Sequence, residues 1–173
     1  MDDSVLQAMA KWPDVPECFG WLRLDARGRW RVPSGLIEHP RMIEFIGRNY
    51  THDAQGRWSF QNGPQRVYVD LEYAPWVYRL RAGQMLDHIG RSAGPLEQAW
   101  IDEAGAVVLR TSAGIGLIDD RDMADLPCDW HEPSGRGWLP WDGRRVPLVP
   151  IRRDQVPELG GFVRQPGRAG TSC

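Results

Sequence analysis

The sequence predicts an α+β fold in which antiparallel β-hairpins form a curved sheet, barrel-like or split into two sheets, with two or three short helices. Three observations carry this prediction. Short segments of alternating apolar and polar residues recur along the chain, separated by turns that contain Gly and mostly begin with Asp. Apolar residues at helical spacing are confined to short segments. A Pro- and Trp-rich C-terminal arm follows.

Three segments are expected to be helical. The first begins after Asp2 or Asp3 and ends before Pro13, because the residue before a proline disfavours helix. The second begins at Pro40, a residue favoured in the first helical turn. The third covers residues 120–126. The apolar residues at helical spacing are Val5, Leu6, Met9 and Trp12 in the first segment, and Met42, Ile43, Ile46 and Tyr50 in the second.

The strand with the clearest alternation follows the hairpin signal Asn62-Gly63. On that strand Val67, Val69 and Leu71 alternate with polar residues and Tyr68, which predicts one buried face. The other expected strands are 19–24, 29–32, 57–61, 76–81, 96–102, 106–111 and 115–118.

Two turns share the pattern D-A-x-G-R-W, at Asp25–Trp30 and at Asp53–Trp58. In both, Asp caps the turn and Gly supplies the positive φ that other residues adopt only with strain. We therefore expect Gly28 and Gly56 to have positive φ. The repeated pattern is explained by the same turn chemistry at both positions, and an ancient duplication remains the alternative.

Composition changes at Pro127, and the chain from Pro127 onward holds seven of its 14 prolines and three of its nine tryptophans. We expect residues 1–126 to form the α+β core domain and residues 127–173 to form an extension. That extension is expected to make a hairpin across Asp142-Gly143 or to lie over the core. The last ten or so residues are expected to be disordered.

Charge and composition exclude several classes. The net charge of −2 lacks the basic excess of a non-specific nucleic-acid binder, so we expect no nucleic-acid partner. The N-terminus does not resemble a signal peptide, and no apolar run is long enough to span a membrane. The three cysteines do not predict a secreted disulfide framework. These features predict a cytoplasmic protein without a membrane partner.

Arginine and aromatic residues alternate on several predicted strands, and this is the main candidate binding feature. Such strand faces can stack the bases of single-stranded nucleic acid, but they also form ordinary sheet faces on which tryptophan packs. The candidate binding residues are Trp30, Arg57, Trp58, Trp76 and Arg79.

Acidic and histidine residues offer an alternative site, made of His52, Asp53, Asp119, Asp120 and Asp122. The acidic run at 119–122 resembles a magnesium site, yet it also opens a predicted helix, where acidic residues act as caps. The Cys and His spacings are poor for zinc. We assign no catalytic residue, no metal and no cofactor.

Five stretches together resemble a family of small uncharacterised proteobacterial proteins, classed as a domain of unknown function. They are Ala8–Pro13, Gly20–Leu22, Phe45–Tyr50, Phe60–Val69 and Asp119–Asp122. The likeness covers about the first 125 residues, and the tail departs from it. The resemblance implies a bacterial protein but no activity.

Three functions remain open. The first is a non-enzymatic binding or protein-interaction module, whose partner is an unidentified protein or a second copy of the chain. The second is a small-molecule pocket or an enzyme inside the curved sheet. The third is a single-strand nucleic-acid binder.

Overall fold

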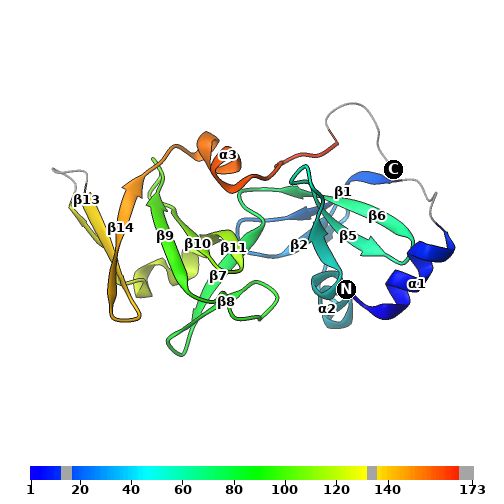
Figure 1. The fold of residues 1–173 in the computed structure, drawn as a ribbon, viewed down its shortest axis with the longest axis horizontal. Helices are drawn as coiled ribbons and strands as arrows, with labels where there is room; N and C mark the ends of the chain where they lie inside the picture. Colours follow the sequence, from blue (N-terminus) through cyan, green and yellow to red (C-terminus); the bar gives the residue numbers. More distant parts are fainter. Residues whose placement is uncertain (13–16, 132–135, 168–173) are drawn as a thin grey trace. The chain divides into compact units, whose positions relative to one another are not determined.

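A computed structural model describes residues 1–12, 17–131 and 136–167 (Figure 1). The chain forms two compact units, each containing one sheet. The first unit comprises residues 1–25, residues 29–73 and the chain from Gly161 onward. The second unit comprises residues 26–28 and 74–160.

The first unit is a six-stranded sheet in the order β3-β2-β1-β6-β5-β4, with the helices α1 (Asp3–Lys11) and α2 (Pro40–Arg48). Strand β1 runs parallel to β6, and the other neighbours are antiparallel. The strands are β1 (Cys18–Leu24), β2 (Trp30–Val32), β3 (Gly35–Leu36), β4 (Tyr50–His52), β5 (Trp58–Asn62) and β6 (Gln65–Leu71). On β6 the predicted face, Val67, Val69 and Leu71, is buried.

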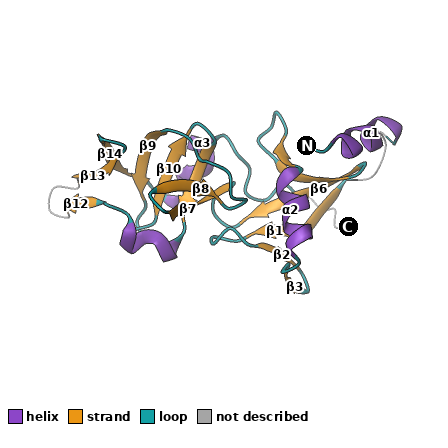
Figure 2. Cartoon of the chain, turned by 90° about the horizontal axis from the view of Figure 1, so that it is seen from below, coloured by secondary structure: helices purple, strands orange, loops and turns teal. Residues whose placement is uncertain are grey.

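The second unit is an eight-stranded sheet in the order β12-β13-β14-β9-β10-β11-β7-β8. Its strands are β7 (Trp76–Arg81), β8 (Gln84–Asp87), β9 (Leu96–Ile101), β10 (Val107–Thr111), β11 (Gly114–Ile118), β12 (Asp129–His131), β13 (Arg136–Trp141) and β14 (Arg144–Pro150). The 3₁₀ turns η1 (Asp120–Asp125) and η3 (Arg153–Gln155) and the short helix α3 (Val156–Gly160) complete it, and Figure 2 shows these helical segments beside the strands.

The two units share a strand order. In the first unit five neighbouring strands run β2-β1-β6-β5-β4, and in the second unit five run β8-β7-β11-β10-β9. In each, the first strand of the unit pairs in parallel with the strand that ends a hairpin: β1 with β6, and β7 with β11. The same topology therefore occurs twice in one chain.

The D-A-x-G-R-W turns behave as predicted, since Gly28 and Gly56 both have a φ of +73°. In each turn the aspartate Oδ1 accepts the backbone N–H four residues on, and Oδ2 accepts the Nε–H of that arginine. A turn at Asp87–Arg91 makes the same contacts, although only D-x-x-G-R remains of the pattern. Asp102 caps a fourth such turn without an arginine, because Ala106 stands at that position.

The α+β class and the curved sheet are confirmed. The parallel pairs β1–β6, β7–β11 and β9–β14 were not predicted, because parallel strands are joined by long connections that local patterns do not reveal. The hairpin across Asp142-Gly143 joins β13 to β14. The third predicted helix is the 3₁₀ turn η1.

The C-terminal part of the chain is integrated into both units. Strand β14 pairs with β9, and Leu139 and Leu148 on β13 and β14 are buried. These contacts cross the boundary expected at residue 127, and separate folding of residues 1–126 stays a prediction. The expected terminal disorder concerns residues that lie mostly outside the described part of the chain, although Arg164 is placed and its carbonyl accepts the N–H of Leu71.

A C-terminal strap, residues 161–167, lies on the first unit. The Val163 N–H donates to the Gly56 carbonyl, and Val163 forms a parallel bridge with Arg57. Phe162 is buried, and Gly167 lies against the Phe19 ring. The strap thus ties the turn that follows β4 to the end of β6.

Candidate binding groove

The tryptophans of the predicted stacking surface lie in the core. Trp30, Trp58 and Trp76 are 1%, 8% and 5% exposed. Trp30 and Trp58 pack on either side of Tyr50, with ring centroids 5.1 Å and 4.6 Å from the Tyr50 ring. Stacking a base requires an accessible ring face, and these three rings supply none in this structure.

The arginines of that surface are bound by carboxylates. Arg57 Nε lies 2.7 Å from Asp53 Oδ2, and the Arg57 guanidinium also covers the Tyr68 ring at 4.7 Å. Arg79 Nε lies 2.7 Å from Asp122 Oδ2. Both arginine side chains are therefore engaged in ion pairs that stabilise the local structure.

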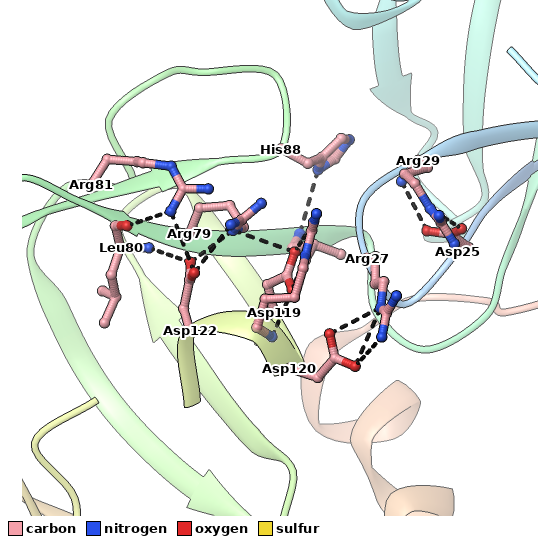
Figure 3. A network of polar contacts seen from close by, with 12 residues as sticks. Asp25, Arg27, Arg29, Arg79, Leu80, Arg81, His88, Asp119, Asp120 and Asp122 are labelled. Carbon is pink, nitrogen blue, oxygen red and sulfur yellow. Dashed lines mark hydrogen bonds and ion pairs between the residues drawn. The ribbon is translucent and has the colours of Figure 1, made fainter. Parts of the chain in front are cut away.

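The acidic run of residues 119–122 forms an ion-pair network within the second unit (Figure 3). Asp122 accepts hydrogen bonds from the Arg79 side chain, the Leu80 N–H and the Arg81 side chain. Its hydrogen bond with Arg79, with help from the Leu80 N–H, lowers the Asp122 pKa to about 2.

The other two carboxylates of the run are also paired with arginine. Asp119 is fully buried, and its carboxylate binds the Arg121 side chain. Asp120 binds Arg27 through two oxygens, and this hydrogen bonding lowers the Asp120 pKa. Such satisfied carboxylates serve structure: within the described ranges, no three His, Cys, Asp or Glu side chains are placed to hold a metal ion.

His52 and Asp53 lie side by side in the first unit but do not converge on a cavity. His52 Nδ1 is 3.1 Å from the Asp53 carbonyl, and its ring packs 4.9 Å from Trp58. The Asp53 carboxylate is committed to its own turn, through the N–H groups of Gln55 and Arg57. The Asp53 carboxylate also binds the Arg57 side chain, so it is engaged in an ion pair that acid–base chemistry would have to break.

Helix α2 forms one wall of an apolar groove. Its sequence, Pro-Arg-Met-Ile-Glu-Phe-Ile-Gly-Arg, begins with proline in the first turn and ends with Arg48 at the negative end of the helix dipole. Ile46 is buried against the sheet, and Phe45 meets Phe60 of β5 edge-to-face at 5.4 Å. One turn before Phe45 and Ile46 on the same side of α2, Met42 is 45% exposed.

Between α2 and strands β1, β2 and β5 lies a groove of about 730 Å³, entirely within the first unit. We call it the α2 groove. Apolar side chains dominate its surface, and Trp21 at its edge is 45% exposed although it is a large aromatic residue. The apolar lining residues are Trp21, Val32, Ile37, Met42, Phe45, Ile46 and Phe60.

Four polar residues complete the lining: Glu38, His39, Arg41 and Asn62. Three of them come from the start of α2 and the segment just before it. In the part of the chain that the structure describes, the side chains of Glu38, His39 and Arg41 form no ion pair with the protein. The groove therefore combines an apolar body with charges grouped along one stretch of chain.

Sequence reasoning did not find the α2 groove. Its residues come from four separate elements, and only the fold brings them together. One signal was present: the apolar side of the second predicted helix includes Met42 and Phe45 besides Ile46, which is wider than one strand pair can cover. The sequence prediction placed Met42 and Ile46 on the apolar face of that helix, together with Ile43 and Tyr50, and did not include Phe45.

The fold and the groove define an α+β protein with an apolar groove beside α2. Residues 1–167 match the model of the DUF2944 family, described as "Protein of unknown function (DUF2946)", and the chain belongs to that family. The match extends through the tail, which was expected to depart from its relatives. No curated protein matches the chain.

Two crystal structures of DUF1285 family proteins resemble the structure. The protein from Silicibacter pomeroyi DSS-3 is 20% identical, with a TM-score of 0.53 over 86% of this chain and 96% of that one. The protein from Shewanella baltica OS155 is 16% identical, with a TM-score of 0.46 over 60% of this chain and 87% of that one. At these identities the first likeness concerns the fold alone.

Proposed function

We propose that this protein is a non-enzymatic binding module whose α2 groove takes a small apolar ligand. One observation carries the proposal: a groove of about 730 Å³, walled by seven apolar side chains, lies beside a helix. Small-molecule sites typically have roughly 300–1,000 Å³ and a mostly apolar lining with a few polar groups. The α2 groove meets both criteria.

The energetics favour occupancy by an apolar group. Trp21 and Met42 each expose nearly half of their surface at the groove. Covering apolar surface gains roughly 25 cal/mol per Å², so a ligand that covers both side chains recovers part of the cost of exposing them. Exposed tryptophan and methionine are also typical of recognition surfaces.

The other two functions have less support. A nucleic-acid surface made from Trp30, Trp58 and Trp76 lacks exposed rings, and its arginines are paired with aspartates. An enzyme site built on the acidic run lacks a free carboxylate, because arginines bind all three. No observation favours either function over binding in the α2 groove.

Titration with the uncharged dye Nile red tests the proposal. We expect saturable binding to the wild-type protein, and we expect Met42→Glu to weaken it at least tenfold by placing a charge in the groove. The matched control is Val149→Glu, because Val149 is 47% exposed and lies on β14 in the second unit. Equal loss in both variants, or no saturable binding to the wild type, contradicts the proposal.

The proposal also covers where in the cell the protein is located and whether its copies associate with one another. No helix among the described residues is long and apolar enough to cross a membrane. We propose a cytoplasmic location. Cell fractionation with thiol labelling tests the location, and gel filtration over a concentration range tests self-association.

A further inference from the structure

We propose that the ligand of the α2 groove carries a carboxylate or similar anionic group at the end of its apolar body, and that Arg41 binds this group. The inference rests on the proposed binding function and adds the chemical class of the ligand. It derives from the charges along the groove, which are independent of the apolar lining.

Arg41 is the strongest polar anchor in the groove. It lines the groove, it is exposed, and within the described residues it forms no ion pair or side-chain hydrogen bond. This is unusual in a protein whose arginines mostly bind aspartates, as Arg48 does at the other end of the same helix. A guanidinium can donate two parallel hydrogen bonds to one carboxylate, so Arg41 has unused capacity for such a group.

The surrounding charges favour an anion over a cation. Glu38 also lines the groove and opposes Arg41 with one negative charge. The first turn of α2 contains no acidic residue, so nothing there offsets the roughly half positive charge at the start of a helix. The balance at this end of the groove is positive.

Three probes that share one alkyl chain length but differ in head group distinguish the contribution of the head group to binding from that of the apolar chain. In displacement of Nile red from the wild-type protein, we expect octanoate to act at about tenfold lower concentration than 1-octanol, and octylammonium to be the weakest. The preference for octanoate is expected to shrink as salt is added, because the site is open to solvent.

Arg41→Gln is expected to remove the preference for octanoate while leaving displacement by 1-octanol unchanged. Arg48→Gln is the matched control, because it removes the same charge from the same helix outside the groove, and the preference should persist. Circular dichroism checks that both variants fold, and Arg41→Lys should keep part of the preference if Arg41→Gln is misfolded.

The outcomes separate the two proposals. If 1-octanol and octanoate displace the dye equally, the anionic head group is wrong while the binding function stands. If octylammonium is strongest, Glu38 is the anchor and the inference is overturned. If the wild type binds neither the dye nor any probe, both proposals fail.

Discussion

One local contact recurs in the turns of this protein: an aspartate carboxylate caps the turn, and in most of these turns an arginine side chain binds the same carboxylate. In the turns at Asp25, Asp53 and Asp87 the carboxylate caps backbone N–H groups and also binds an arginine side chain. At Asp102 the same turn forms with Ala106 in place of arginine. The backbone contacts of the carboxylate therefore suffice to shape the turn, and the arginine pairing is an addition.

Asp122 is the carboxylate whose loss should cost most. We expect Asp122→Asn to lower the free energy of unfolding by about 2–3 kcal/mol, because it removes the nearer of the two carboxylates that pair with the half-buried Arg79 and leaves only Asp119, at 3.3 Å. It should also reduce acid sensitivity. The folded-state pKa of Asp122 is about 2, below its ordinary 3.8, so its stabilisation is full above pH 4 and is lost as the pH falls towards 2.

Urea denaturation between pH 2 and pH 7 measures both effects. Asp154→Asn is the control, because Asp154 forms an ion pair with Arg152 in which both side chains are largely exposed. Exposed pairs contribute little, so no measurable change is expected at pH 7. A wild-type stability that does not change between pH 4 and pH 2 would falsify the assignment to Asp122.

Gly56 is expected to tolerate no side chain. In Gly56→Ala the new Cβ would overlap the Gly161 carbonyl oxygen, and the φ of +73° adds strain. Thermal unfolding should show a loss well above the roughly 1 kcal/mol of left-handed strain alone. Gly105→Ala provides the comparison, since Gly105 has a φ of +80° with nothing within 4 Å. Similar losses in the two variants would show that the strap moves aside freely.

At the scale of elements, local patterns predicted what depends on local physics. The alternation of Val67, Val69 and Leu71 identified a buried strand face, and Pro40 identified the start of α2. Gly28 and Gly56 have the predicted positive φ because turn geometry is fixed by a few adjacent residues. The turn at Asp87 was missed because only its Asp, Gly and Arg match the pattern.

Local sequence patterns could not predict which strands pair when those strands lie far apart in the chain. β1 pairs with β6 across a connection that contains β2, β3, α2, β4 and β5. Trp30, Trp58 and Trp76 were interpreted as binding residues because alternation with arginine does not reveal which face a neighbour covers. The α2 groove depends on both kinds of information, so neither its position nor Arg41 could be predicted.

At the scale of the whole molecule, the C-terminal segment contributes to both units. Leu148 and Val156 are buried in the second unit, and Phe162 is buried in the first. Each such side chain contributes roughly 1.5–3 kcal/mol by burial. The tail therefore supplies a large part of a net stability that is typically about 5–15 kcal/mol.

Two truncations test how far the first 126 residues fold without that tail. A chain that ends at Gly160 loses the strap, and we expect a cooperative transition weakened by about 3 kcal/mol or more, the scale of losing Phe162. A chain that ends at Leu126 loses strands β12–β14 as well, and we expect a much larger loss. Guanidinium denaturation followed by circular dichroism measures both. A chain of residues 1–126 that is as stable as one ending at Gly160 would establish the boundary at residue 127.

The short outermost strands of both sheets have a consequence for behaviour at high protein concentration. β3 and β8 contain two and four residues, and β4 and β12 contain three each. Exposed sheet edges are templates for fibrils and for strand exchange between molecules. Edges this short offer few unpaired N–H and C=O groups in a row, so the backbone has little means of recruiting another chain. Association between copies of this protein is then expected to depend more on side-chain contacts than on backbone pairing at the sheet edges.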